Sequence, residues 1–267
     1  MQINIKRIAA LLTVSALLSC LASCKGDTGE SDTESSLPPS DSPTVLYLPS
    51  PLPESEDMGE EYIDSFVFLG ESTTYHLKSR GVLKDGADTK QVWGPKSGTL
   101  MLDATTASCR IVYPESGEEL DIYEATRRKR PEFILLTFGL NGATRSISRG
   151  ESYFSACYEK LIDTLLKASP DTTVILQSCF PVGKEMDVSG FSVDTATLNR
   201  YIEEINGWTE RLAERRSLGY LNTAEILRNA DGYLKVEYEA DDHYHLNADA
   251  YRAILGYIRT HGYPSEV

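Results

Sequence analysis

The chain has 267 residues, and 41% of them are hydrophobic, which is enough for one large domain or two small ones with a real core. Its 40 acidic and 26 basic residues give a formal net charge of -14. A surface of this sign repels nucleic acid and anionic lipid headgroups, so nucleic-acid binding is disfavoured.

The N-terminus has the order of a secretory signal. Lys6 and Arg7 precede an apolar run, residues 8–18, that is too short to span a bilayer. The tetrapeptide Leu21–Cys24 resembles a bacterial lipobox, which predicts a signal peptide over residues 1–23 and a lipidated Cys24. The protein is then expected on the cell membrane, outside the cytoplasm. An ordinary cleaved signal with an unmodified cysteine is the alternative, and Cys20 is a poorer lipidation candidate.

The composition changes after Cys24. Residues 25–60 are rich in Ser, Pro and acidic residues, which predicts a disordered tether, and residues 61–267 are expected to form the folded domain. The other cysteines of this region are odd in number and show no CxxC spacing: Cys109, Cys157 and Cys179. Buried thiols are therefore favoured over a disulfide framework or a cysteine zinc site.

From Tyr62 onward, short apolar runs alternate with longer amphipathic segments, which predicts a parallel sheet covered by helices. Strands are expected at residues 66–69, 109–113, 133–139, 173–179 and 218–221. Helices are expected at residues 73–78, 119–130, 151–168, 195–216 and 248–261.

Ser72 follows the first of these strands, on the turn into a helix. Such a turn exposes a hydroxyl beside the free N–H groups of a helix start, where an oxyanion can be stabilised. A plain turn followed by a helix N-cap is the alternative interpretation of this Gly-x-Ser sequence.

Two further segments carry candidate donors. Asn141 comes just after the strand at 133–139, so its amide lies on the same sheet edge as Ser72 if the two strands are parallel. It is also a common turn former. Gly94 and Gly98 lie in a loop between the strands expected at 66–69 and 109–113. Glycine lets a backbone N–H approach a ligand there, although a tight turn is equally compatible.

Two of the four histidines stand in the segment before the last helix. Asp242 and His245 are three residues apart, so the carboxylate can accept the imidazole N–H and leave the other ring nitrogen free to take a proton. The alternative takes Asp242, His243 and His245 as metal ligands. No metal-binding spacing supports it, and His243 and His245 would point apart in an extended chain.

Together these segments resemble the SGNH (GDSL-type) hydrolases, an esterase superfamily of the α/β class. The resemblance covers Ile63 to Tyr263 and implies a three-layer, flavodoxin-like α/β/α fold with a mainly parallel central sheet. Four sequence blocks match in order: Gly70–Thr74, Ser97–Gly98, Gly139–Asn141 and Asp242–Asn247.

The resemblance implies a role for each matched residue. Ser72 would be the nucleophile, His245 the general base and Asp242 the group that orients His245. The oxyanion would be held by the Ser72 and Gly98 backbone N–H groups and the Asn141 side chain, with Gly94 as the alternative to Gly98. No metal or cofactor is required.

One residue departs from the family pattern, because Glu71 stands where an aspartate usually precedes the nucleophile. Its longer side chain is expected to change how the turn is supported, without reacting itself. Arg145 and Arg149 follow Asn141 and are interpreted as solvated loop arginines, with contact to an anionic substrate as the alternative.

The predicted function is therefore a membrane-tethered serine esterase acting on acyl esters, for instance O-acetyl groups of envelope glycans, with lipid esters as a further option. The acyl length, the alcohol and the oligomeric state stay open. The alternative is a binding lipoprotein that kept the fold without the chemistry. Retention of every acid-base and donor position argues against that alternative.

Overall fold

The computed structural model describes residues 48–264. The predicted signal, Cys24 and the first part of the predicted tether lie outside the described residues. A central sheet consists of five strands: β1 (Phe66–Gly70), β2 (Val92–Trp93), β5 (Phe133–Thr137), β6 (Thr173–Gln177) and β7 (Gly219–Leu221). Their order is β2-β1-β5-β6-β7, and all neighbours are parallel.

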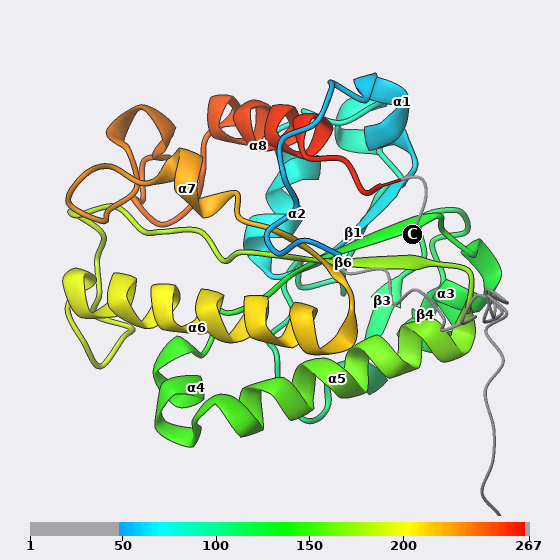
Figure 1. The fold of residues 1–267 in the computed structure, drawn as a ribbon, viewed down its shortest axis with the longest axis horizontal. Coiled ribbons are helices and arrows are strands. Elements are labelled where there is room, and N and C mark those ends of the chain that lie inside the picture. Colours follow the sequence, from blue (N-terminus) through cyan, green and yellow to red (C-terminus); the bar gives the residue numbers. More distant parts are fainter. Residues whose placement is uncertain (1–47, 265–267) are drawn as a thin grey trace, which may run out of the picture. The chain divides into compact units, whose positions relative to one another are not determined.

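The two faces of the sheet pack against different helices, because successive side chains of a strand point to opposite faces. On β1, Val67 and Leu69 belong to one buried cluster, and Phe66 and Phe68 to the other. Long helices cover the first face: α5 (Glu151–Ala168) and α6 (Thr195–Arg216). The second face is covered by α1 (Gly59–Asp64), α2 (Ser72–Ser79) and α8 (Ala248–Thr260). Figure 1 shows these three layers, which confirm the predicted fold class.

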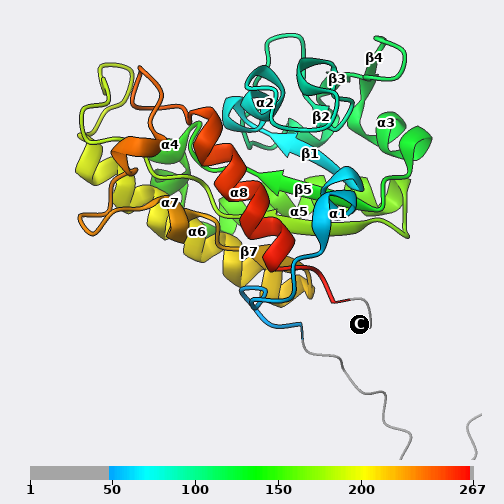
Figure 2. The same ribbon diagram turned by 90° about the horizontal axis from the view of Figure 1, so that it is seen from above.

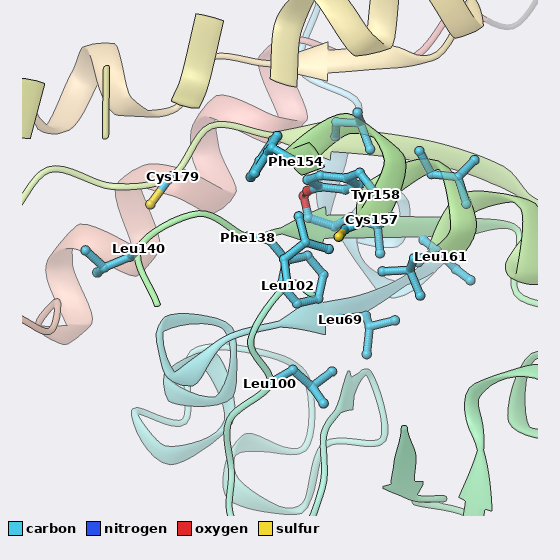
Figure 3. Close-up of a cluster of buried hydrophobic side chains, with 14 of the residues drawn as sticks. Leu69, Leu100, Leu102, Phe138, Leu140, Phe154, Cys157, Tyr158, Leu161 and Cys179 are labelled. Carbon is cyan, nitrogen blue, oxygen red and sulfur yellow. The ribbon is translucent and has the colours of Figure 1, made fainter. Parts of the chain in front are cut away.

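The core on the α5 side follows from the helical spacing of apolar residues. Phe154, Tyr158 and Leu161 recur every three or four positions, so they share one face of α5. Figure 3 shows this face packed toward Leu69 of β1 and Phe138 just after β5. The bounds predicted for α5 and α6 agree with the structure.

One region differs from the expectation. The strand predicted at 109–113 is β3 (Arg110–Val112), and it pairs antiparallel with β4 (Glu119–Asp121) outside the central sheet. The helix predicted from residue 119 begins only at Ile122, because Asp121 caps α3 (Ile122–Lys129) by accepting the Glu124 N–H at 2.7 Å. The hairpin lies on the β2 side of the sheet (Figure 2), and Ile122 and Ala125 of α3 belong to the buried cluster on the α5 face.

The shorter elements complete the described chain. They are the helices α4 (Ala143–Arg149) and α7 (Ala224–Leu227) and the 3₁₀ turns Gly86–Asp88, Thr106–Ser108 and Val236–Tyr238. Within residues 48–264, no helix combines the length and apolar character needed to cross a membrane.

The domain begins earlier than residue 61, which corrects the predicted end of the tether. Leu52 is only 1% exposed, and its N–H donates to the Tyr220 carbonyl of edge strand β7 at 2.8 Å. The Ser55 N–H donates to the Thr260 carbonyl at the end of α8, at 2.6 Å. Residues 48–58 form neither a helix nor a strand, but Leu48 and Leu52 are buried on the α8 side of the sheet.

Candidate active site

Ser72 is the first residue of α2, directly after β1 and Glu71. The strand approaches its neighbour so closely that a Cβ on Gly70 would lie 2.4 Å from the Thr137 carbonyl oxygen of β5. Glycine is therefore required at this position. Backbone N–H groups in the first turn of a helix have no carbonyl of a preceding turn to bond, so the Ser72 N–H stands where an anion can be received.

Three side chains from two distant segments form one hydrogen-bonded row. The Ser72 Oγ lies 3.1 Å from the His245 Nε2, across 173 residues of sequence. On the other side of the ring, the His245 Nδ1 lies 2.6 Å from the Asp242 Oδ2. The structure thus brings together the three residues for which the resemblance implies nucleophile, base and orienting carboxylate.

Asp242 is held as a carboxylate. Burial by itself raises the pKa of Asp242, but hydrogen bonds from the backbone and ring of His245 and from the Tyr244 N–H outweigh it and lower the pKa to about 2. The Oδ1 atom accepts the two backbone N–H groups, from Tyr244 at 3.1 Å and from His245 at 2.8 Å. This leaves the Oδ2 atom for the imidazole, so the carboxylate is fixed in direction and in charge.

The segment that carries Asp242 and His245 is tied down at both ends. Glu239 and Leu246 form an antiparallel bridge, and the Ala240 N–H donates to the His245 carbonyl at 2.9 Å. Asn247 then caps α8 by accepting the Ala250 N–H at 3.0 Å. A loop with these contacts holds its side chains in place before any ligand binds.

Asn141 reaches the same sheet edge from β5, as the parallel strands predicted. The turn before it depends on Gly139, whose φ of 144° lies in the region that favours glycine, and where a Cβ would lie 2.7 Å from Ile205. The Asn141 Nδ2 donates to the Thr99 Oγ1 at 2.9 Å and to the Leu100 carbonyl at 3.1 Å.

Glu71 joins the Ser72 turn to the Asn141 turn. Its carboxylate, in a residue only 2% exposed, accepts the backbone N–H groups of Gly139, Leu140 and Asn141 at 3.0, 3.1 and 3.0 Å. Burial raises the pKa of Glu71 to about 7, although the three N–H donors act in the opposite direction. The residue that departs from the family pattern thus supports the turn that carries Asn141.

The backbone N–H predicted as a donor in the glycine loop has a partner within that loop. The Gly98 N–H donates to the Pro95 carbonyl at 2.9 Å within the loop, and Gly98 has a φ of +75°. A Cβ on Gly98 would lie 3.4 Å from the Tyr75 ring of α2. The alternative residue, Gly94, accepts the Val112 N–H at 2.9 Å. The Gly98 N–H is therefore engaged inside its own loop in this structure.

The metal-ligand alternative is not supported by the side-chain directions. The His243 Nδ1 contacts the Glu239 carboxylate, whereas the His245 Nδ1 contacts Asp242, so the two histidines serve different partners. Within residues 48–264, no group of three or more His, Cys, Asp or Glu residues is arranged to hold a metal ion.

The two arginines after Asn141 already have neighbours. Arg145 lies 3.9 Å from Asp103, and the Arg149 guanidinium lies 4.6 Å from the centre of the Tyr153 ring. Neither contact points to an anionic substrate.

Sequence reasoning missed Thr99, Tyr244 and His76. The Tyr244 hydroxyl donates to the Asn141 Oδ1 at 2.9 Å, and the rings of His76 and His245 lie 4.2 Å apart between centroids. For His76 a signal existed, because it stands four residues after Ser72 and one helical turn places both on the same face of α2. No comparable signal marks Tyr244, whose role depends on a contact 103 residues away.

A family model described as the GDSL-like lipase/acylhydrolase family matches residues 68–253. The chain belongs to this family. The resemblance seen in the sequence is thereby confirmed, and membership of the GDSL-like acylhydrolases implies ester hydrolysis as the class of reaction.

Solved structures similar to this GDSL-like acylhydrolase include a candidate acylhydrolase from Bacteroides fragilis, at 15% identity over 79% of this chain and 88% of the other, with a TM-score of 0.48. A GDSL-like lipase from Bacteroides thetaiotaomicron is 15% identical over 73% and 85%, with a TM-score of 0.46. An acetyl-xylooligosaccharide esterase from Geobacillus stearothermophilus is 14% identical over 75% and 94%, with a TM-score of 0.42. No curated protein matches the chain.

Proposed function

We propose that the protein is a serine esterase that cleaves acyl esters through an acyl-enzyme, with Ser72 as nucleophile, His245 as general base and Asp242 as the orienting carboxylate. The observation that supports this most is the hydrogen bond of 3.1 Å between the Ser72 Oγ and the His245 Nε2. A serine hydroxyl is a weak nucleophile until a base accepts its proton, and this geometry supplies the base.

The first half-reaction transfers the acyl group to the enzyme. The Ser72 oxygen forms a bond to the ester carbonyl carbon while its proton passes to the His245 Nε2, and Asp242 stabilises the resulting imidazolium. The carbonyl π electrons move to the carbonyl oxygen. When the tetrahedral intermediate collapses, the bond to the alcohol oxygen breaks and His245 returns the proton to the leaving alcohol. In the second half-reaction, water takes the place of the alcohol and releases the acid.

The negative oxygen of the intermediate needs donors that are already in place. The Ser72 N–H at the start of α2 and the Asn141 side-chain amide are the donors that this geometry favours. The Gly98 N–H stays the third predicted donor, and it would have to exchange the Pro95 carbonyl for the substrate oxygen. Removal of one such donor costs about 10²- to 10³-fold in turnover.

The surface beside Asp242 is polar. A hollow of about 280 Å³ lies there, and four of the six residues that line it are charged: Arg80, Glu239, Asp241 and Asp242. A sugar would find hydrogen-bond partners in such a lining, which supports a polar alcohol; Ser72 and His245 do not line the hollow, so it says nothing of the acyl length. The substrate class that we propose is a short-chain ester, such as an O-acetyl group on a glycan.

Reaction with a fluorophosphonate probe tests the nucleophile. We expect the folded protein to be labelled and Ser72→Ala to be unlabelled. The matched control is Ser79→Ala, at the opposite end of α2, which should label like the unaltered protein. Absence of labelling in folded protein would instead favour a binding lipoprotein with the same fold.

Hydrolysis rates on p-nitrophenyl esters of increasing chain length, together with acetylated xylan and peptidoglycan, test the substrate class. Activity should fall as the acyl chain lengthens. A rate that rises toward long acyl chains would overturn the short-chain assignment while leaving the nucleophile in place.

The location follows from the sequence alone. The lipobox-like residues Leu21–Cys24 support cleavage before Cys24 and lipid attachment to its thiol, which would anchor the esterase to the outer side of the cell membrane. Full-length protein made in a bacterial host should partition into the detergent phase, and Cys24→Ala should move it to the aqueous phase. Equal partitioning of the two would rule out the anchor.

A further inference from the structure

The Asn141 side-chain amide is hydrogen-bonded at both its oxygen and its nitrogen end. Its Oδ1 accepts the Tyr244 hydroxyl at 2.9 Å, and its Nδ2 donates to the Thr99 Oγ1 at 2.9 Å and to the Leu100 carbonyl at 3.1 Å. The Leu100 carbonyl can only accept, so the nitrogen end must face residues 99–100. The oxygen end is thereby left facing the hydroxyl of Tyr244.

The two N–H hydrogens of this amide are not equivalent. One is anchored on the Leu100 carbonyl, which belongs to the backbone. The other meets the Thr99 hydroxyl, a side-chain group on a rotatable bond that also donates to the Leu100 carbonyl at 3.1 Å. A substrate oxyanion can replace a rotatable hydroxyl more easily than a fixed carbonyl, so the second N–H is the one available to the reaction.

We propose that Tyr244 is a positioning residue for ester hydrolysis, whose hydroxyl holds the Asn141 amide in the orientation that offers this N–H to the oxyanion. The proposal rests on the proposed function. Tyr244 lies within the fourth sequence block, but the family resemblance implies no role for it. Burial raises the pKa of Tyr244 well above its ordinary value, so the hydroxyl stays protonated and able to donate throughout the neutral and mildly alkaline range.

Tyr244 also connects the two halves of the site. Its backbone N–H donates to the Asp242 Oδ1 at 3.1 Å, and its ring stands edge-on to the His245 ring with centroids 4.6 Å apart. One residue therefore contacts the carboxylate, the base and the amide. The hydroxyl touches Asn141, whereas the ring touches His245, so a change to phenylalanine separates these two roles.

The first test is the kinetics of Tyr244→Phe. We expect kcat to fall roughly tenfold, less than the loss of an entire oxyanion donor, with KM unchanged within about twofold. The acid limb of the profile of kcat against pH should not move, because the contact between the ring of residue 244 and His245 is retained. The matched control is Tyr257→Phe, which also removes a hydroxyl that donates to a side-chain oxygen at 2.9 Å, on Glu225 away from this site, and should keep full activity.

A double-mutant cycle decides whether Tyr244 acts through Asn141. In an Asn141→Ala background, Tyr244→Phe should have no further effect on kcat, because the amide that it orients is gone. Additive losses in kcat, unchanged activity of Tyr244→Phe, or a shifted acid limb would each overturn the proposal.

A readout without activity separates this proposal from the proposed function. In the NMR spectrum of the unaltered protein, the Asn141 Nδ2 hydrogens, assigned by their absence in Asn141→Ala, should show NOEs to Thr99 and not to the Tyr244 ring. The reverse pattern would overturn the orientation even if Tyr244→Phe did not fold. A protein with no esterase activity and no Ser72 labelling would instead refute the proposed function.

Discussion

The imidazole rings of His76 and His245 lie 4.2 Å apart between centroids, at an interplanar angle of 43°. His76 comes from α2 and therefore braces His245 from the same helix that begins with Ser72. Burial, followed by the neighbouring His245 and Arg80, lowers the pKa of His76 to about 4, with Asp242 acting in the opposite direction. His76 is thus neutral at neutral pH and adds no positive charge beside His245.

Packing against His245 is the role that we expect for His76. His76→Ala opens a space beside the imidazole and should lower kcat by about 10- to 100-fold, since small misplacements of a reacting group are costly. His76→Phe keeps an aromatic ring there and should retain most of the activity. Steady-state kinetics with a short p-nitrophenyl ester measure both, and equal activity of the alanine variant and the unaltered protein would contradict this role.

Glu71 should be needed for the Asn141 turn. Glu71→Gln replaces one carboxylate oxygen with an NH₂ group that cannot accept, which leaves at least one of three backbone N–H groups without a partner. We expect a loss of about 1–3 kcal/mol in unfolding free energy for each buried N–H left unpaired. Activity should fall as well, because Asn141 would shift.

Glu71→Asp, which restores the residue usual in the family, is the matched variant for that experiment. It keeps the charge but is one methylene shorter, so it should lie between Glu71→Gln and the unaltered protein in both stability and kcat. Urea unfolding at pH 8 gives the stability ranking. A glutamine variant as stable as the unaltered protein would show that the bridge contributes nothing.

Stability should depend on pH in two opposing ways. The folded pKa of His76 is about 4 against an ordinary 6.5, so its contribution is complete above 6.5 and is lost as pH falls toward 4. The folded pKa of Glu71 is about 7 against an ordinary 4.5, so the folded state binds the extra proton and stability declines as pH rises from 4.5 to 7.

Single variants separate these two slopes. The unfolding free energy of His76→Phe, measured by urea titration, should lack the decline below pH 6.5. That of Glu71→Gln should lack the decline between pH 4.5 and 7. If the unfolding free energy of either variant changes with pH in parallel with that of the unaltered protein, the substituted residue is not the source of the assigned slope.

The segment before residue 61 should be part of the stable unit. Leu52→Ala should destabilise the domain by about 2–5 kcal/mol, as expected for a buried leucine. A chain that begins at residue 61 should be less stable than one that begins at residue 48, because it also lacks the hydrogen bonds to Tyr220 and Thr260. Thermal unfolding followed by circular dichroism compares them, and identical midpoints would restore residue 61 as the boundary.

Local pattern determined much of the fold. The apolar runs at β1 and β5 and the helical spacing along α5 and α6 are properties of neighbouring residues, so the alternation of strands and helices could be predicted. The order of the central strands could not, and the strand at residue 110 pairs with β4 instead of joining the sheet. Strand pairing depends on contacts between distant residues, which periodicity does not encode.

The same division runs through the candidate site. The sequence by itself marked Ser72, Asp242 and His245, because their types and spacing match the four blocks of a known family. Only the tertiary structure decided that Glu71 supports the Asn141 turn, that the Tyr244 hydroxyl contacts the Asn141 amide and that Leu52 belongs to the domain. These contacts join residues 68 to 168 positions apart. Such pairs meet only once the sheet and its helices have closed around a common core.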